Sequence, residues 1–404
     1  MKKIIFTLII IHCSLIIGKC QWVQCSGITG GTIYSLAVSG SNIFAGTTYE
    51  GVFISTNNGT TWTQTALNNR DVYSLAVNGN NIFAGTNYYG VYISTNNGTT
   101  WTQTALNNRD IFSIAASGNN VLAGTSSYGI YLSTNNGNSW TQTSLNNQEI
   151  RSFAVSGNNV FAGTGGNGVY LSTNNGTTWT QTTLNNRFIW SLAASGNNIF
   201  AGTDYYGVFY SSNNGSVWIQ TALNNLWVYS LALYSSNVIA GTIYDGVYLS
   251  TNYGSVWFLK NQGFSTIPTI RALLIANNYI FAGTYGYSIW RRGLTEIIGI
   301  KNISYKIPVE YKLFQNYPNP FNPVTKIKFE IPPFYPPLGK GGNGGVSLKI
   351  FDILGKEITT LVNEQLSPGT YEVTFDGSNL ASGIYFYQLR SGDFVESKKL
   401  ILIK

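Results

Sequence analysis

Few side chains in this sequence could act as acids, bases, nucleophiles or metal ligands. Its one histidine, His12, lies in a segment that we expect to be removed, which excludes a histidine-based triad or a histidine-ligated zinc site from the mature chain. Cys25 then has no histidine to activate its thiol. The carboxylates of residues 21–293 are scattered along the chain, at Glu50, Asp71, Asp110, Glu149, Asp204 and Asp245. We therefore expect no catalytic residues, no cofactor and no metal site.

Aromatic and arginine side chains are better candidates, for binding. Much of the chain is a repeat whose copies are nearly identical, so the few variable positions stand out. One lies 11 residues before each Ala-Gly-Thr triplet and holds, in chain order, Tyr34, Tyr73, Phe112, Arg151, Trp190, Tyr229 and Arg271. A second follows the triplet and includes Tyr88, Tyr89, Tyr205 and Tyr206. A third lies at the entry to the first strand and holds Arg70-Asp71, Arg109-Asp110, Gln148-Glu149, Arg187-Phe188 and Leu226-Trp227. Such groups suit stacking on sugars or contact with a protein partner, although the first set would also suit packing between neighbouring repeats.

The repeat itself predicts the structural elements that position these residues. The stretch Ser55–Gln64 recurs through the chain, and its tryptophans lie 39 residues apart, at Trp62, Trp101, Trp140, Trp179, Trp218 and Trp257. Within one unit, residues 72–106, four short β-prone segments alternate with turns rich in Gly and Asn. Four strands in about 40 residues are typical of one blade of a β-propeller.

Counting the repeats indicates how the ring closes. The Ala-Gly-Thr triplet occurs seven times, beginning at Ala45, Ala84, Ala123, Ala162, Ala201, Ala240 and Ala282, whereas the repeat has only six tryptophans. Residues 22–24 match residues 62–64, so the N-terminal segment is expected to supply the outer strand of the last blade. We predict a seven-bladed β-propeller over residues 21–293. All the variable positions should then surround one mouth of its central channel, with the Asn-Gly turns at the other.

The motif Ser-x-Asn-x-Gly-x-x-Trp resembles the Asp-box, or BNR, repeat of sialidase-type and assembly-factor propellers, with Asn57 where that family usually has Asp. The resemblance covers residues 22–292. It implies a structural turn on the face opposite the ligand site. In this turn Asn57 accepts backbone N–H groups, Gly59 adopts positive φ and Trp62 packs between strands.

After Arg292 the repeat stops, and we expect a linker over residues 294–310 and a small Ig-like β-sandwich over residues 311–404. The segment 316–323 (Asn-Tyr-Pro-Asn-Pro-Phe-Asn-Pro), Leu354-Gly355-Lys356-Glu357 and Ser382-Gly383-Ile384-Tyr385 closely resemble the type A sorting domain of type IX secretion substrates. The resemblance implies the type IX machinery as a partner and passage through the outer membrane. Residues 332–345 depart from the pattern and are interpreted as a low-complexity insertion in a hairpin loop. A plain sandwich with another binding role is the alternative.

The N-terminal segment has the pattern of a secretory signal peptide. Lys2 and Lys3 precede an apolar run from Ile4 to Ile17, and cleavage is expected near Cys20. We assign residues 1–20 to this leader, and no later stretch is long and apolar enough to span a membrane. Without the leader, residues 21–293 carry eight Lys and Arg against six Asp and Glu, and residues 294–404 carry twelve against ten. This balance excludes a basic stripe for nucleic acid.

The sequence thus predicts an all-β protein, a seven-bladed propeller followed by a sandwich, that is secreted or held at the outer cell surface. We expect a non-enzymatic binding module whose ligand is a glycan or a surface protein. The alternatives are a secreted glycan-active, sialidase-like hydrolase and a structural surface component without a ligand. A sialidase would need an arginine triad and a Tyr–Glu pair at unique positions, and the repeated arginines here do not supply one.

Overall fold

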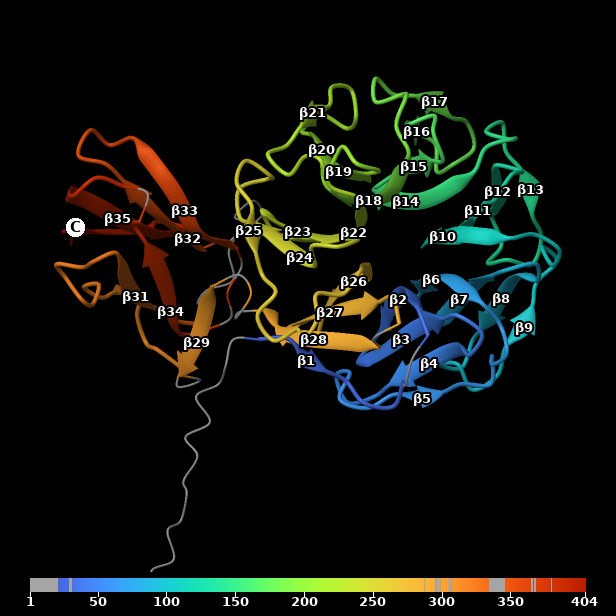
Figure 1. Ribbon diagram of the computed structural model, residues 1–404, viewed down its shortest axis with the longest axis horizontal. Coiled ribbons are helices and arrows are strands. Elements are labelled where there is room, and N and C mark those ends of the chain that lie inside the picture. The colour runs from blue at the N-terminus through green and yellow to red at the C-terminus, as the bar shows by residue number, and fades with distance from the viewer. Residues whose placement is uncertain are drawn as a thin grey trace, which may run out of the picture.

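The computed structural model describes residues 21–28, 31–286, 288–294, 297, 299–304, 307–333, 346–364, 366, 368–378 and 380–404. The predicted signal peptide, with His12, and residues 334–345 of the predicted insertion lie outside these residues. The described chain is all-β and forms nine four-stranded sheets. Seven of them are arranged in a ring and two form a sandwich beside it (Figure 1).

The seven sheets of the ring are the blades of a propeller, each an antiparallel four-stranded meander. Their innermost strands surround the centre of the ring (Figure 1). From the centre outward, blade 1 is β2 (Ile33–Ser39), β3 (Asn42–Thr47), β4 (Gly51–Ser55) and β5 (Thr63–Gln64); blade 2 is β6 (Val72–Asn78), β7 (Asn81–Thr86), β8 (Gly90–Ser94) and β9 (Thr102–Gln103); blade 3 is β10 (Ile111–Ser117), β11 (Asn120–Thr125), β12 (Ile130–Ser133) and β13 (Thr141–Gln142); blade 4 is β14 (Ile150–Ser156), β15 (Asn159–Thr164), β16 (Val169–Ser172) and β17 (Thr180–Gln181).

Blades 5 and 6 repeat this pattern, and blade 7 takes one strand from the beginning of the chain. Blade 5 is β18 (Ile189–Ser195), β19 (Asn198–Thr203), β20 (Val208–Ser211) and β21 (Ile219–Gln220); blade 6 is β22 (Val228–Tyr234), β23 (Asn237–Thr242), β24 (Val247–Ser250) and β25 (Phe258–Leu259); blade 7 is β26 (Ile270–Ala276), β27 (Tyr279–Thr284), β28 (Ile289–Gly293) and β1 (Val23–Gln24). Val23 pairs with Arg291 and Gln24 with Trp290. The predicted closure by the N-terminal segment is confirmed.

The Ala-Gly-Thr triplet explains how closely the blades pack. It lies on the second strand of each blade, where the side chains are almost completely buried between neighbouring blades. A Cβ atom on Gly85 would lie 2.6 Å from Cγ2 of Ile111 in the next blade, and one on Gly283 would lie 2.6 Å from Cγ2 of Ile33. Glycine therefore allows each innermost strand to approach its neighbour, including the contact that joins blade 7 to blade 1.

The recurring Asn-Gly turn has the structural role expected of it. In the first copy, the Oγ atom of Ser55 accepts a hydrogen bond of 2.9 Å from the Gly59 N–H, and Oδ1 of Asn57 accepts one of 2.9 Å from the Thr61 N–H. Gly59 has φ 74° and Trp62 is buried. In blade 3 the N–H of Asn136 in this turn bonds to the carbonyl of Asn119, in the turn between the first two strands. These turns lie at the end of the blade opposite the start of the first strand.

The C-terminal sandwich consists of two sheets that enclose alternating apolar side chains. One sheet has the order β29–β34–β31–β30 and the other β33–β32–β35–β36. Their bounds are β29 (Ile300–Ser304), β30 (Lys312–Leu313), β31 (Val324–Ile331), β32 (Val346–Phe351), β33 (Glu357–Glu364), β34 (Gly369–Asp376), β35 (Gly383–Ser391) and β36 (Phe394–Leu402). Ile327, Phe329, Leu348, Tyr387 and Leu400 are all fully buried between the sheets. Alternate burial of this kind is what the period of two in the sequence predicts.

The predicted linker over residues 294–310 is wrong in part. Residues 300–304 form β29, which pairs with β34 at the edge of the sandwich, Ile300 opposite Val373 and Lys301 opposite Glu372. An unpaired edge of β34 would expose its backbone hydrogen-bonding groups, and β29 covers that edge. The sandwich therefore begins before residue 311.

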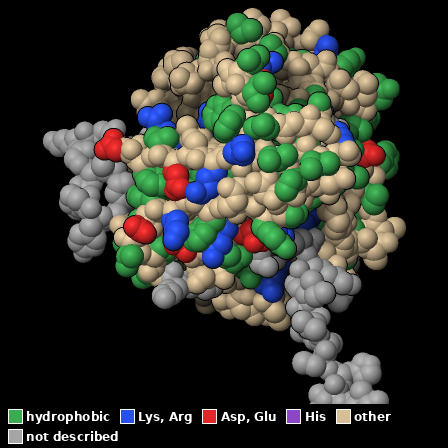
Figure 2. All heavy atoms as spheres, turned by 90° about the vertical axis from the view of Figure 1, so that its left-hand side faces the viewer, with side chains coloured by type: hydrophobic (Ala, Val, Ile, Leu, Met, Phe, Trp, Pro, Cys, Tyr) green, Lys and Arg blue, Asp and Glu red, His purple; other side chains and the backbone are tan. Residues whose placement is uncertain are grey.

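The face of the molecule at the sandwich end carries no single-sign field. Lys and Arg side chains are interspersed there with Asp and Glu (Figure 2). Three pairs in the sandwich are in contact, Lys326 with Glu372 at 2.9 Å, Lys349 with Glu357 at 2.8 Å, and Lys398 with Glu396 at 3.0 Å.

Candidate functional site

Seven side chains, one from each blade, surround a cavity of about 340 Å³ at the centre of the propeller. They are Tyr34, Tyr73, Phe112, Arg151, Trp190, Tyr229 and Arg271. We call them the channel ring. The structure brings together all seven residues of the first variable position.

A β-bulge at the start of each first strand positions these residues. In blade 1, Ile33 pairs with Thr47 and Ser35 with Gly46, so Tyr34 is an extra residue without a partner on β3. The same shift occurs in every other blade, at Tyr73, Phe112, Arg151, Trp190, Tyr229 and Arg271. A bulge changes the direction of one side chain relative to the regular alternation. In each first strand the residue at the bulge is the one that lines the channel cavity.

The aromatic members of the channel ring contact one another edge to face. The ring centroids of Tyr34 and Tyr73 are 4.9 Å apart, and those of Tyr73 and Phe112 are 5.6 Å apart. In the neighbouring blades 5 and 6, the ring centroids of Trp190 and Tyr229 are 4.6 Å apart. Each contact joins two neighbouring blades, so the predicted packing between repeats is also present. All five rings are half-buried, which leaves part of each one accessible from the cavity.

The two arginines complete the circle through cation–π contacts. The Arg151 guanidinium lies 4.1 Å from the centroid of Phe112 and 5.1 Å from that of Trp190. The Arg271 guanidinium lies 4.1 Å from the centroid of Tyr229. Guanidinium groups bind the negative faces of aromatic rings in this way, so the channel ring forms a nearly continuous chain of contacts.

The two arginines of the channel ring differ in their ion pairing. Arg151 forms an ion pair with Glu149, which precedes it by two residues. Within the described part of the chain, Arg271 has no carboxylate within ion-pair distance, and its Nε–H is buried without a hydrogen-bond partner. The residues that line the cavity therefore present a cation and include no carboxylate.

Two tyrosine hydroxyls in the ring remain protonated at neutral pH. Burial raises the pKa of Tyr73 to about 12, with a further contribution from the negative charge of Asp71. Burial also raises the pKa of Tyr229, while the positive charge of Arg271 acts in the opposite direction. Both phenols can therefore donate a hydrogen bond into the cavity.

The second predicted set does not line the channel cavity. Tyr88, Tyr89, Tyr205 and Tyr206 lie in the loops between the second and third strands of blades 2 and 5, and all four are exposed. Tyr89 lies beneath the Arg70 guanidinium at 4.1 Å, and Tyr206 beneath that of Arg187 at 4.1 Å. These loops lie at the end of the blade where the first strand begins, as predicted, but only the first set lines the cavity.

Two partners of the channel ring come from the variable position at the entry to the first strand, which the sequence predicts at the same mouth of the channel. The ring centroid of Phe188 lies 4.4 Å from that of Trp190 and 5.6 Å from the Cζ atom of Arg151. Glu149 forms the ion pair with Arg151. Both occupy variable positions just before the first strand. Blades 2 and 3 have Asp at this position.

Among the described residues no group of three or more His, Cys, Asp or Glu side chains is placed to hold a metal ion. The same residues include no helix with the length and apolar character needed to cross a bilayer.

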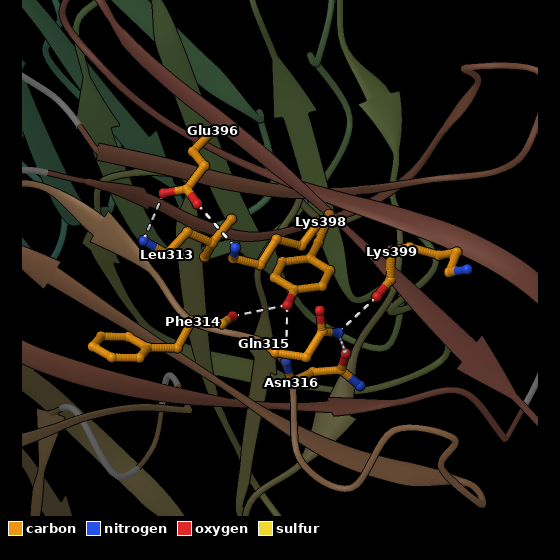
Figure 3. Close-up of polar contacts among 8 residues, drawn as sticks. Leu313, Phe314, Gln315, Asn316, Glu396, Lys398 and Lys399 are labelled. Atoms are coloured by element: carbon orange, nitrogen blue, oxygen red, sulfur yellow. Dashed lines mark hydrogen bonds and ion pairs between the residues drawn. The ribbon is translucent and has the colours of Figure 1, made fainter.

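In the sandwich, the segment that carries the Asn-Tyr-Pro motif is bonded to the last two strands (Figure 3). The Tyr387 hydroxyl donates a hydrogen bond of 2.8 Å to the carbonyl of Phe314 and accepts one of 2.8 Å from the N–H of Asn316. The Gln315 amide donates a bond of 2.8 Å to the carbonyl of Lys399, and Oε2 of Glu396 accepts one of 2.9 Å from the Leu313 N–H. The motif is thus part of the folded sandwich.

Comparison with known families supports the assignment of both the propeller and the C-terminal domain. Residues 315–404 match the family described as the secretion system C-terminal sorting domain, and residues 106–225 match the DUF6242 beta propeller domain. The chain carries a type IX sorting domain behind a β-propeller, which indicates export to the cell surface or secretion.

Solved structures with the same propeller fold share little sequence with this chain. YCF48 from Cyanidioschyzon merolae has a TM-score of 0.57 at 15% identity, over 68% of this chain and 99% of that chain. A structure of YCF48 bound to D1 peptide has a TM-score of 0.56 at 14% identity, over 68% and 96%. The computationally designed Ika8 protein has a TM-score of 0.53 at 12% identity, over 67% and 98%. No curated protein matches the chain.

Proposed function

We propose that this secreted protein is a non-enzymatic binding module whose ligand enters the central channel. One observation carries the proposal. The repeat is nearly invariant, but the side chain at the bulge of the first strand differs in type from blade to blade. This same position lines a cavity of about 340 Å³. Variation concentrated at a concave, partly apolar site is typical of a surface that selects a ligand.

The chemistry of the channel ring favours a terminal sugar residue of a glycan. Half-buried aromatic rings offer faces and edges for the C–H groups of a pyranose, while the hydroxyls of Tyr73 and Tyr229 and the guanidinium of Arg271 offer donors for its oxygens. A protein segment is the second ligand class to test, since one propeller of the same fold is seen bound to a peptide.

The charges of the site argue against a hydrolase. Hydrolysis of a glycosidic bond ordinarily needs two carboxyl groups on either side of it, and the cavity lining has none. The nearby Glu149 does not line the cavity and is held in an ion pair with Arg151.

The test is a glycan-array and pull-down screen with the full secreted chain and with the double variant Trp190→Ala, Tyr229→Ala. The matched control is Val217→Ala, Ile219→Ala, which removes two exposed apolar side chains from the outer part of blade 5. We expect wild-type and control proteins to bind the same ligand and the channel variant to lose it. Unchanged binding by the channel variant would refute the proposal, and release of sugar from the bound glycan by the wild-type protein would refute its non-enzymatic part.

A further inference from the structure

Three exposed tyrosines outside the channel have a backbone conformation that tyrosine rarely adopts. Tyr49, Tyr88 and Tyr205 occupy the same position in blades 1, 2 and 5, with φ of 64°, 62° and 58°. Their exposed fractions are 77%, 70% and 60%. The equivalent residues of blades 3 and 4 are Ser127 and Gly166, so the repeat does not require an aromatic side chain here. A bulky residue that is both strained and exposed contributes little to the fold and points to a role in binding.

Between blades 1 and 2 the first two of these tyrosines border a cleft of about 340 Å³. Its lining consists of Tyr49, Asn69, Arg70, Asp71, Asn87, Tyr88 and Tyr89. The carboxylate of Asp71 accepts a hydrogen bond of 2.7 Å from the Tyr49 N–H and one of 3.4 Å from the Asn87 side chain, while Arg70 covers Tyr89. This set of contacts fixes Tyr49 on one side of the cleft and Tyr89 on the other.

The same contacts recur one blade further on, and Tyr88 takes part in both copies. Asp110 accepts a hydrogen bond of 2.8 Å from the Tyr88 N–H and one of 3.3 Å from the Ser126 hydroxyl. Arg109 lies 4.3 Å from the centroid of Tyr128. Blades 1 to 3 therefore carry two subsites in series, each with an exposed tyrosine, a second tyrosine beneath an arginine, and an aspartate.

The series ends at blade 4. Gln148 and Asn167 stand there in place of the arginine and the tyrosine beneath it, and the Asn167 amide donates a hydrogen bond of 2.7 Å to Oε1 of Gln148. The loop thus keeps its internal contact while its aromatic surface is lost. Blade 6 has Leu226 and Trp227 where blade 2 has Arg70 and Asp71, so it lacks both the arginine and the aspartate of the subsite.

We propose that these two subsites bind consecutive units of an uncharged, unbranched polysaccharide that runs across blades 1 to 3. Repetition of a subsite with a shared tyrosine fits a ligand that itself repeats. Each subsite holds one arginine and one aspartate, so it favours neither an anionic nor a cationic polymer. Tyrosine faces stack on pyranose rings, and the amide, carboxylate and guanidinium groups exchange hydrogen bonds with hydroxyls. The residues involved are separate from the channel ring.

The first test is affinity electrophoresis of the full secreted chain in gels containing β-1,4-glucan, β-1,4-mannan, β-1,4-xylan, β-1,3-glucan, α-1,4-glucan or polygalacturonate. We expect retardation by at least one neutral polymer and weaker retardation by polygalacturonate. Titration calorimetry with oligosaccharides of that polymer should show affinity rising at least tenfold between two and six sugar units, because a longer chain occupies both subsites. Retardation by none of the neutral polymers, or affinity independent of chain length, would overturn the proposal.

The decisive variant is Tyr88→Asn, with Tyr205→Asn as its matched control. Both changes remove an exposed ring and relieve the same backbone strain, so neither should lower the melting temperature. Tyr88→Asn should weaken binding of the six-unit oligosaccharide about tenfold, whereas Tyr205→Asn should leave it unchanged. Equal effects of the two changes would overturn the proposal. If instead the double variant Trp190→Ala, Tyr229→Ala abolishes binding and Tyr88→Asn weakens it less than twofold, the channel is the polysaccharide site and the proposal of two subsites across blades 1 to 3 is refuted.

Discussion

The indole N–H of Trp22 donates a hydrogen bond of 2.7 Å to the backbone carbonyl of Lys260, a residue 238 positions away in the chain. The ring of Trp22 is 1% exposed and stacks on Phe264 with a centroid distance of 5.2 Å. Next to it, β1 pairs with β28 in blade 7. A segment of a few residues thus joins the beginning of the propeller to its end.

Removing that contact should destabilise the propeller as a whole. Trp22→Ala is expected to cost about 3–5 kcal/mol, as for other buried tryptophans, and deletion of residues 21–25 should cost at least as much. Val23→Ala is the control, since Val23 is 52% exposed. Calorimetric melting temperatures of the three variants provide the measurement, and an unchanged value for the deletion would contradict closure by β1.

The thiol of Cys25 offers a second measurement of closure. Burial raises its pKa to about 11, against the opposing effect of the positive charge of Arg291. At pH 8 only about one thiol in a thousand should then be a thiolate, so a disulfide reagent should react slowly with the folded chain and quickly with the denatured chain. Trp22→Ala should raise the rate in the folded state. Fast labelling of the wild-type protein would show that β1 does not remain paired.

Substitution of a triplet glycine should separate two blades. Gly85→Ala places a Cβ atom 2.6 Å from Cγ2 of Ile111, and overpacking of this kind costs about 1–3 kcal/mol. The double variant Gly85→Ala, Ile111→Ala should cost less than the sum of the two single changes, because it removes the Cγ2 atom that the new Cβ meets. Chemical denaturation measures both, and additive effects would mean that the two residues do not meet.

Most of the propeller could be predicted from the sequence because seven similar repeats each indicate the same four-stranded blade. Seven Ala-Gly-Thr triplets indicate seven blades, and the match of residues 22–24 to residues 62–64 indicates the closure. The channel ring could be found because nearly identical copies make a variable position conspicuous. The bulge could not, since the segment Ile33–Leu36 has no glycine or other mark of an extra residue. The direction of the Tyr34 side chain depends on how β2 pairs with β3, which no local sequence feature indicates.

The start of the sandwich could not be predicted for a different reason. Residues 300–304 are a short segment, and their partner β34 lies about 70 residues later in the sequence, so no local turn signals the pairing. A chain of residues 299–404 should consequently unfold at a higher temperature than one of residues 311–404. Thermal denaturation followed by circular dichroism compares the two, and equal midpoints would show that β29 adds nothing to the sandwich.

The hydroxyl of Tyr387 should make the sandwich sensitive to alkaline pH. Burial raises its pKa to about 12 from an ordinary value of 10.0. The protonated phenol therefore stabilises the fold fully below pH 10, and this contribution, about 3 kcal/mol at most, is lost as the pH rises towards 12. Tyr387→Phe should be less stable at pH 8, because the Asn316 N–H loses its acceptor, but its stability should fall less between pH 10 and 12. Parallel pH profiles of the two proteins would contradict this assignment.

Closure within blade 7 also makes the order of the blades along the gene arbitrary. β1 and β28 are neighbours in one sheet, so a short peptide could join the two ends of the ring, and the chain could be reopened between any other two blades. Such a circular permutant, begun for example between blades 3 and 4, would keep every pair of strands and every inter-blade contact. In the natural arrangement β1 and the segment that leads to the sandwich both leave the ring at blade 7, so this one blade carries both the closure of the ring and the connection to the sorting domain.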